Sequence, residues 1–353
     1  MSYNVTIQPT GDQICVEEGQ TILQAALRQG VWLPFACGHG TCATCKVQVL
    51  DGDVDVGAAS PFALMDVERD EGKVLACCAT VSSDVTIEAD IDVDEDFLGY
   101  AVNDYVSTVT SIIDLSPTIK GIHLRLSKPM QFQAGQYINL NIPGIDGARA
   151  FSMANTPKDT QDIELHIRLV DGGLATEYIH NNLCIGDELA LSGPYGQFFV
   201  RDSLQGDLLF IAGGSGLSSI QSMILELVAK SDKRKITLCQ GARNKAELYN
   251  QDLFENLEKN NLNFKYIPAL SDISDQENWA GYRGFVHEAA NEFFHGKFAD
   301  LKAYLCGPPM MINAAISTLM KGRLFERDIF MERFLTAADG DGNDQKSALF
   351  KKI

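Results

Sequence analysis

The cysteines in the first quarter of this chain constrain its fold more than any other feature. Cys37, Cys42 and Cys45 follow a C-x4-C-x2-C spacing, and the adjacent Cys77 and Cys78 offer a fourth thiol further along. This spacing is typical of a 2Fe-2S cluster held by four thiolates. Glycines between the first two cysteines allow the chain to wrap tightly, because a Cβ would hinder the turn. The sequence therefore predicts an iron-sulfur site near the N-terminus.

Three other uses of these cysteines are less favourable. A zinc site more often has two separated C-x2-C pairs, and only Cys42 and Cys45 form one. A Rieske centre would need a second C-x-x-H segment after Cys37 and His39, and none follows. Disulfides are disfavoured because residues 1–11 do not resemble a secretion signal. We therefore expect a cytoplasmic protein with reduced thiols.

Length and charge limit the class of partner. The 353 residues suggest two or three domains, and no apolar run approaches the roughly 20 residues that cross a bilayer. The net charge is -18, and residues 1–100 carry 17 acidic against 4 basic residues, or -13. This acidity disfavours nucleic acid and favours a basic docking surface on a protein partner, although a merely solvated acidic surface is the simpler alternative.

Apolar patterns divide the chain into three domains. Residues 1–93 combine short strands at 3–7, 14–16, 46–50 and 85–89 with one helix over 21–27, which predicts a small mixed sheet. An acidic linker follows at 94–103. Residues 104–203 contain short strands with Gly and Pro between them, which is typical of an antiparallel barrel. Residues 204–353 alternate buried strands with helices, which predicts an α/β domain with a parallel sheet.

Two glycine-containing turns in the last domain follow apolar strands. Gly213–Gly214–Ser215–Gly216–Leu217–Ser218 comes after the apolar run 208–212 and precedes a helix, and Cys306–Gly307–Pro308 comes after another buried strand. A strand, a glycine-rich turn and a helix N-terminus together can bind a pyrophosphate. In a parallel sheet, ligands bind at the carboxyl ends of the strands. The two turns therefore predict one nucleotide site.

The barrel segment carries a second set of candidate binding residues. Arg149, Phe151 and Ser152 place a cation, a ring and a hydroxyl close together, and on an extended strand Ser152 faces away from the other two. The run Gly172–Thr176 then opens a helix whose N-terminus could take a pyrophosphate. Alone, the run Arg149–Ser152 is more often an ordinary surface strand.

The order of these motifs resembles the ferredoxin-NADP reductase superfamily, in the version with an N-terminal ferredoxin domain. Segments 33–40, 193–199 and 330–334 are similar to those of reductase components of multicomponent phenol hydroxylases. The likeness covers essentially the whole chain. It implies a β-grasp ferredoxin domain, an antiparallel flavin-binding barrel and a parallel α/β nucleotide-binding domain.

The resemblance also implies roles for individual residues. Its L-A-C signature selects Cys77 over Cys78 as the fourth ligand, with Cys37, Cys42 and Cys45. Ser152, Cys306 and Phe334 are expected at the reacting centre, where Ser152 would lie near the flavin N5 and Phe334 could cover the flavin. The expected cofactor-binding residues are Arg149, Phe151, Ser152, His166, Arg168, Gly173, Leu174, Ala175, Thr176, Gly213, Gly214, Ser215, Gly216, Leu217, Ser218, Arg243, Cys306, Gly307 and Pro308.

Electron counting then predicts the function. Reduced nicotinamide gives two electrons as a hydride and a 2Fe-2S cluster accepts one, so FAD must stand between them. We expect a path from NADH through FAD and the cluster to the di-iron oxygenase component of a phenol hydroxylase. NADPH is an alternative to NADH, because Arg243 could meet a 2'-phosphate.

Two other functions share some of these features. A reductase of a ring-hydroxylating dioxygenase would have the same domain order with another partner. A non-enzymatic iron-sulfur carrier or sensor would explain the cysteines but not the two nucleotide-type segments. The acidic run 339–344 suggests a calcium loop, but glycine is missing at its sixth position and glutamate at its last, so we expect a solvated loop.

Overall fold

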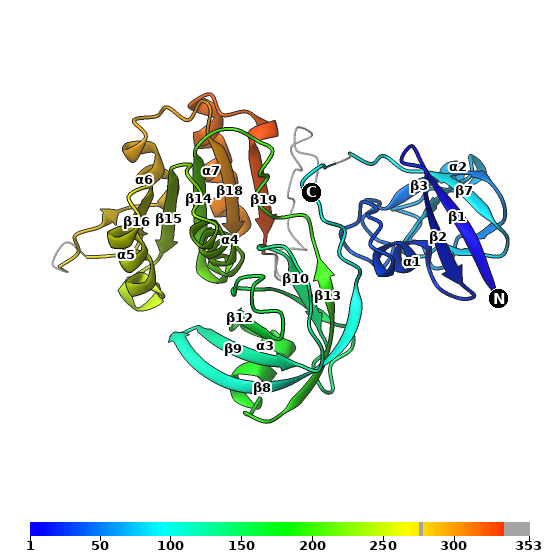
Figure 1. The fold of residues 1–353 in the computed structure, drawn as a ribbon, viewed down its shortest axis with the longest axis horizontal. Helices are drawn as coiled ribbons and strands as arrows, with labels where there is room; N and C mark the ends of the chain where they lie inside the picture. Colours follow the sequence, from blue (N-terminus) through cyan, green and yellow to red (C-terminus); the bar gives the residue numbers. More distant parts are fainter. Residues whose placement is uncertain (93, 275–277, 335–353) are drawn as a thin grey trace. The chain divides into compact units, whose positions relative to one another are not determined.

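The structure is a computed structural model that describes residues 1–92, 94–274 and 278–334 (Figure 1). The chain folds into two compact units, Met1–Asn103 and the residues from Asp104 onward. No helix in the described ranges is long and apolar enough to cross a membrane. The run 339–344, considered above as a calcium loop, lies outside the described residues.

The first unit contains the mixed sheet predicted from the sequence. Its strand order is β2-β1-β7-β3-β5, in which β1 runs antiparallel to β2 and parallel to β7. The strands are β1 (Ser2–Gln8), β2 (Asp12–Glu17), β3 (Lys46–Asp51), β5 (Lys73–Leu75) and β7 (Val85–Glu88), with a separate pair β4 (Val54–Asp55) and β6 (Thr80–Val81). Alternate residues of β1 and β2 are buried, as expected for a sheet with one face in the core.

Helix α1 (Ile22–Arg28) begins where the sequence predicts it. Thr21 forms a capping box with Gln24, in which the Thr21 Oγ1 accepts from the Gln24 N–H at 3.3 Å. Ile22, Leu23 and Ala26 on one side of the helix are buried in the core of this unit. The second helix, α2 (Asp66–Asp70), is short and lies between β4 and β5 in the chain.

The segment predicted as an acidic linker packs within the first unit. The Val102 N–H donates to the Leu27 carbonyl at 2.9 Å, and the Phe97 ring lies 5.8 Å from that of Trp32. Gly30 and Gly99 approach so closely that a Cβ on Gly30 would lie 2.3 Å from the Gly99 carbonyl oxygen. Residues 97–102 therefore belong structurally to the first unit.

The second unit begins with the predicted antiparallel barrel. Its strand order is β11-β10-β13-β8-β9-β12, and a bridge between Met153 and Leu165 joins the two edges. The strands are β8 (Asn103–Ser116), β9 (Ile119–Leu126), β10 (Tyr137–Leu140), β11 (Arg149–Ser152), β12 (Asp162–Arg168) and β13 (Glu188–Tyr195). Helix α3 (Leu174–Asn181) follows β12 and packs Ala175 and Ile179 into the barrel core.

A parallel six-stranded sheet forms the rest of the second unit. Its order is β17-β16-β15-β14-β18-β19, and every strand pair described in it is parallel. The strands are β14 (Leu208–Gly213), β15 (Ile236–Ala242), β16 (Phe264–Leu270), β17 (Tyr282–Arg283), β18 (Lys302–Gly307) and β19 (Ile329–Arg333). The helices are α4 (Leu217–Ala229), α5 (Gln251–Asn260), α6 (Val286–Phe293) and α7 (Pro309–Lys321), with 3-10 turns at Gly214–Gly216, Lys245–Glu247 and Glu326–Asp328.

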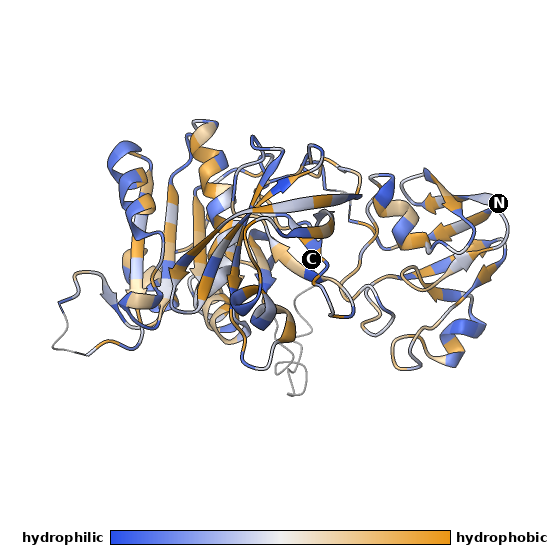
Figure 2. Ribbon diagram, turned by 90° about the horizontal axis from the view of Figure 1, so that it is seen from below, coloured by the Kyte–Doolittle hydropathy of each residue, from blue (hydrophilic) through white to orange (hydrophobic). Residues whose placement is uncertain are grey.

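Side chains along β14 point alternately to the two faces of the sheet and are apolar on both, which explains why helices cover both faces. Leu208, Phe210 and Ala212 pack with α4 and α5 on one face. Leu209 and Ile211 pack with α6 and α7 on the other. Hydrophobic residues accordingly concentrate on the strands, and hydrophilic residues on the outer surfaces of the helices (Figure 2).

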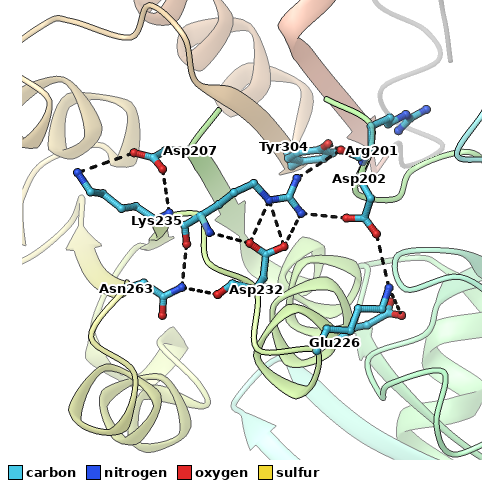
Figure 3. Close-up of polar contacts among 10 residues, drawn as sticks. Arg201, Asp202, Asp207, Glu226, Asp232, Lys235, Asn263 and Tyr304 are labelled. Atoms are coloured by element: carbon cyan, nitrogen blue, oxygen red, sulfur yellow. Dashed lines mark hydrogen bonds and ion pairs between the residues drawn. The ribbon is translucent and has the colours of Figure 1, made fainter. Parts of the chain in front are cut away.

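The connection from the barrel to the parallel sheet, residues 201–207, is held by charged groups. Arg234 donates to both Asp232 and Asp202, at 2.6 and 2.9 Å, and Lys230 pairs with Asp202 and Glu226 (Figure 3). The guanidinium of Arg201 lies between the Phe199 and Phe330 rings, 4.2 and 4.5 Å from their centroids. The last turn of the barrel is thereby attached to the α4–β15 loop and to β19.

Candidate functional site

The cysteine loop of the first unit is already arranged to stabilise thiolates. The Cys37 Sγ accepts from the backbone N–H groups of His39 and Thr41, at 3.5 and 3.4 Å. Burial opposes ionisation here, but these N–H donors bring the pKa of the Cys37 thiol down to about 6. Cys42 is adjacent, since its Sγ accepts from the Cys37 N–H at 3.4 Å. The loop therefore supplies the N–H donors that iron-sulfur ligands need.

The four predicted ligands form two pairs. Cys37 contacts Cys42, and Cys45 is hydrogen-bonded to Cys77, a bond that lowers the pKa of the Cys45 thiol to about 7. Within the described residues, no three metal-binding side chains lie close enough to hold one ion. Two pairs fit a two-iron cluster with two thiolates on each iron better than a zinc ion with four ligands.

Cys77 and Cys78 do not lie on an extended strand. Both residues lie in a turn after β5, in which the Cys78 N–H donates to the Leu75 carbonyl at 2.9 Å. Their Sγ atoms are 3.7 Å apart, and Cys77 is the one bonded to Cys45. The sequence does not indicate this turn, because the apolar residues 74–79 are equally typical of a buried strand.

In the second unit, one carboxyl group joins the barrel to the parallel sheet. Glu332 on β19 accepts a hydrogen bond from the Ser152 Oγ at 3.2 Å, and the Cys306 Sγ lies 3.9 Å from the same Oε2. Ser152 ends β11, and Cys306 is near the carboxyl end of β18. Two of the predicted reacting-centre residues, Ser152 and Cys306, therefore meet at Glu332.

The surroundings of Glu332 favour its neutral form. Burial raises the pKa of the Glu332 carboxyl to about 7, although the hydrogen bonds from Ser152 and Cys306 partly oppose the shift. Burial, and then the charge of Glu332, raises the pKa of the Cys306 thiol well above its usual range. Cys306 thus remains a proton donor to the carboxylate. The third predicted residue, Phe334, is close by, since its N–H donates to the Gly307 carbonyl at 3.1 Å.

The two glycine turns of the parallel sheet meet as the sequence predicts. A Cβ on Gly216 would lie 2.5 Å from the Cys306 carbonyl oxygen, so only glycine permits this approach of β18. Gly214 has a φ of 56° and opens a 3-10 turn that leads into α4. The backbone of 213–218 and the corner 306–308 therefore border one site at the carboxyl edge of the sheet.

A buried side-chain relay connects this turn to the barrel. His166 on β12 contacts the Tyr249 hydroxyl at 3.1 Å through Nδ1 and Glu164 at 2.8 Å through Nε2. The Tyr249 hydroxyl in turn lies 3.4 Å from the Gly214 carbonyl oxygen. Arg168, two residues beyond His166, also reaches this turn, since its guanidinium would lie 3.1 Å from a Cβ on Gly214.

The remaining predicted residues lie apart from this centre. The Arg149 guanidinium is exposed and donates to the carbonyls of Asp146, Gly147 and Ala148 in its own loop. Gly173 is the N-cap of α3, where the Thr176 hydroxyl donates to its carbonyl at 3.0 Å. Arg243 is exposed beyond β15, and its carbonyl accepts from the Asp272 N–H.

Sequence reasoning did not select Glu332, Glu164 or Tyr249 as site residues. Glu332 entered the sequence analysis only as part of the 330–334 motif. The residues next to it in the sequence do not indicate that its carboxyl group contacts Ser152. The Tyr249 contact with His166 joins residues 83 positions apart. Such contacts depend on how barrel and sheet pack, which periodicity does not encode.

Family models match nearly the whole chain, in the order expected from the motifs. Residues 5–82 match the 2Fe-2S iron-sulfur cluster binding domain. Residues 80–200 match the oxidoreductase FAD-binding domain, and residues 210–316 match the oxidoreductase NAD-binding domain. The three matches correspond to the three domains expected from the sequence.

Full-length relatives decide the family. The chain is 68% identical over all 353 residues to the reductase component DmpP of phenol 2-monooxygenase from Pseudomonas sp. (strain CF600), with 100% of both chains covered. It is 64% identical over the same length to the phenol hydroxylase P5 protein of Acinetobacter pittii (strain PHEA-2), again with both chains fully covered. The chain belongs to the family of phenol hydroxylase reductase components. This phenol hydroxylase reductase is an oxidoreductase that uses a 2Fe-2S cluster, FAD and NAD.

Solved structures agree with the fold. The Amycolatopsis reductase GcoB is 34% identical and superposes with a TM-score of 0.83, covering 94% of this chain and 98% of that one. The ferredoxin reductase of a carbazole 1,9a-dioxygenase is 24% identical, with a TM-score of 0.75, and covers 95% of this chain and 99% of that one. The predicted class is confirmed: a ferredoxin domain, a flavin-binding barrel and a parallel α/β nucleotide-binding domain.

Proposed function

We propose that this phenol hydroxylase reductase moves electrons from NADH through FAD and the 2Fe-2S cluster to a di-iron oxygenase that hydroxylates phenol in the cytoplasm. The observation that carries the proposal is the meeting of Ser152 and Cys306 at Glu332, where the carboxyl edge of the parallel sheet reaches the barrel. A hydride donor held at this edge and a flavin held by the barrel would meet there. Full-length identity to phenol hydroxylase reductase components supports phenol as the substrate of the partner.

The barrel residues would hold FAD. Arg149 lies exposed at the start of β11 and would pair with the pyrophosphate, while the partly buried Phe151 would pack against the ring system. The N-terminus of α3, from Gly173 to Thr176, would supply backbone N–H groups to the same pyrophosphate. The buried Ser152 hydroxyl would then be the polar group nearest the flavin ring. When bound, FAD supplies the chemistry that accepts a hydride and releases single electrons.

The parallel sheet would hold the nicotinamide nucleotide. The turn Gly213–Ser218 would bind the phosphates, and the corner Cys306–Pro308 would place the Cys306 thiol beside the nicotinamide. Arg243 is exposed beyond β15, in reach of the ribose end of a nucleotide bound along this edge. His166 and Arg168 would orient the 213–218 turn from the barrel side. Phe334, tied to Gly307, would cover the flavin when no nicotinamide is present.

Cys37, Cys42, Cys45 and Cys77 would hold the 2Fe-2S cluster as two pairs. The backbone N–H groups of His39 and Thr41 would remain aimed at the Cys37 sulfur and offset the negative charge of the reduced cluster. The first unit is also the acidic part of the chain, and a basic surface on the oxygenase would complement it.

An anaerobic titration of the purified protein with NADH tests the proposal. We expect stoichiometric bleaching of the flavin absorbance together with a rhombic EPR signal from a reduced cluster. NADPH in a parallel titration should act much more weakly. Flavin bleaching with no cluster signal in freshly reconstituted protein would contradict the proposed ligands or the electron path. Reduction by NADH without transfer to a phenol hydroxylase oxygenase would contradict the proposed partner.

A further inference from the structure

The chain has a fifth thiol beside the proposed cluster ligands. Cys78 follows Cys77 in the turn after β5, and the two Sγ atoms lie 3.7 Å apart. This is within the range of a hydrogen bond between sulfur atoms. The two residues lie in a tight turn, since the Cys78 and Ala79 N–H groups both donate to the Leu75 carbonyl at 2.9 Å. The ligand roles proposed above do not use Cys78.

Two glycines leave room for Cys78. A Cβ on Gly40, in the loop between Cys37 and Cys42, would lie 2.6 Å from the Cys78 Sγ. A Cβ on Gly57 would lie 2.4 Å from the Cys78 carbonyl oxygen. Both glycines have positive φ values, 83° and 60°, which other residues rarely adopt. The Cys78 side chain is therefore held against the ligand loop, and it is only partly exposed.

The direction of the contact follows from the ligand assignment. A cysteine bound to iron is a thiolate and has no proton to donate. Any hydrogen bond between the two sulfurs must then run from the Cys78 S–H to the Cys77 sulfur. We propose that Cys78 is a tuning residue of the cluster, whose thiol donates to the Cys77 sulfur and raises the reduction potential. This inference rests on the proposed assignment of Cys77 as a ligand.

The sign of the effect comes from charge. Reduction adds one negative charge to the cluster, and a hydrogen bond to a ligand sulfur stabilises the more negative state. A thiol is a weak donor, so the effect should be that of one modest hydrogen bond. We expect loss of this bond to change the ratio of reduced to oxidised cluster at a fixed potential by about fivefold. For a one-electron couple this corresponds to about 40 mV.

The test uses the full-length protein with flavin and cluster bound. Cys78→Ala removes the donor, Cys78→Ser replaces it with a hydroxyl, and Cys15→Ala is the control, because Cys15 is an exposed thiol on β2 of the same unit. Iron content and an EPR-monitored redox titration are measured for each. We expect all three to bind two irons, and only Cys78→Ala to have a clearly lower midpoint potential. If Cys78→Ala does not fold, Cys78→Val keeps the volume without a donor.

Each other result has a definite meaning. A Cys78→Ala protein with a full cluster and an unchanged potential would overturn the hydrogen bond and leave the ligands as proposed. Loss of the cluster in Cys78→Ala, with its retention in Cys77→Ala, would show that Cys78 is the ligand and would overturn this inference and the assignment of Cys77. Flavin bleaching by NADH in the same variants tests the proposed reductase function separately, because it needs no cluster.

Discussion

Glu332 contacts both parts of the second unit, the barrel and the parallel sheet. Its carboxyl group is bonded to a barrel residue, Ser152, and faces a sheet residue, Cys306. Burial raises the pKa of the Glu332 carboxyl to about 7. Tyr137 on β10 is paired with Ser152 on β11. Burial, and then the charge of Glu332, also raises the pKa of the Tyr137 hydroxyl. A carboxyl that titrates near neutrality in such a place can change the charge at the proposed reacting centre within the physiological pH range.

We therefore predict that flavin reduction by NADH speeds up as the pH rises through about 7. Below this pH Glu332 is neutral, and above it the carboxylate can stabilise the positive charge that develops on the nicotinamide as its hydride leaves. Glu332→Gln should remove the pH dependence and lower the rate at pH 8 by about tenfold, the effect of about 1.4 kcal/mol. Stopped-flow measurement of flavin bleaching between pH 5.5 and 8.5 gives both values.

An exposed carboxylate of the same unit provides the control. Glu292 lies on the outer side of α6, and Glu292→Gln should keep the wild-type pH profile. The role of Glu332 would be disproved by a Glu332→Gln enzyme whose profile still bends near pH 7. In that case another group, with its own pKa near 7, would control the hydride step.

Two close glycines hold residues 97–102 against the rest of the first unit. Gly30, just after α1, has a φ of 76°, and a Cβ there would lie 2.3 Å from the Gly99 carbonyl oxygen. Gly11 has a nearly equal φ of 78°, but nothing lies within 4 Å of the position of its Cβ. Gly11→Ala should therefore cost only the backbone strain, about 1 kcal/mol. Gly30→Ala should cost about 2 kcal/mol more, because residues 97–102 must move.

Thermal unfolding monitored through the visible absorbance of the cluster measures this difference. The first unit of Gly30→Ala should melt at a distinctly lower temperature than that of Gly11→Ala. Equal melting temperatures would mean that residues 97–102 move away at little cost, and that the contact with Gly30 does not stabilise this unit.

The charged network around Arg234 attaches the 201–207 connection to the α4–β15 loop. Arg234 bonds to Asp232, Asp202 and the Arg201 carbonyl, and it is partly buried (Figure 3). We expect Arg234→Ala to lower the free energy of unfolding of the second unit by about 2 kcal/mol, because several charge-assisted hydrogen bonds are lost. The neighbouring Lys233 is exposed, so Lys233→Ala removes one positive charge and leaves the hydrogen bonds of Arg234 in place.

Denaturant unfolding followed by flavin fluorescence compares the two variants. Lys233→Ala should stay within about 0.5 kcal/mol of the wild-type protein. An equal loss in both variants would indicate that overall charge, and not the bonds of Arg234, stabilises this region.

Most helices and strands could be predicted because their signals are local. The run 208–212 is apolar on both faces and ends in glycines, which fits a buried parallel strand, and Thr21 with Gln24 marks the start of α1. β19 was not predicted as a strand, because Glu332 and Arg333 interrupt its apolar pattern. The turn at Cys77 was not indicated by the sequence, since the apolar residues around it would equally fit a buried strand. The Glu332 and Tyr249 contacts join distant segments and required the tertiary structure.

Most of the net negative charge of the molecule lies in residues 1–100, which include the match to the iron-sulfur domain. The iron-sulfur part, residues 1–100, has 17 acidic and 4 basic residues, and the remainder has 30 and 25, so the two parts carry -13 and -5. The proposed FAD and NAD sites both lie in the less charged part, where an anionic dinucleotide meets less repulsion. The strongly acidic part carries the cluster that passes electrons to the oxygenase. Long-range steering should therefore act on the partner and not on NADH.

This separation predicts different salt dependences for the two half-reactions. Raising the ionic strength from about 0.02 to 0.5 M shortens the Debye length from about 20 Å to about 4 Å, so attraction between separated surfaces is largely screened. We expect the second-order rate constant for electron transfer to the oxygenase to fall by about tenfold over this range. The rate constant for flavin reduction by NADH should change much less. Stopped-flow measurements of both steps on one preparation supply the comparison. An oxygenase step that is independent of salt would mean that the acidity of residues 1–100 keeps the surface solvated and does not steer the partner.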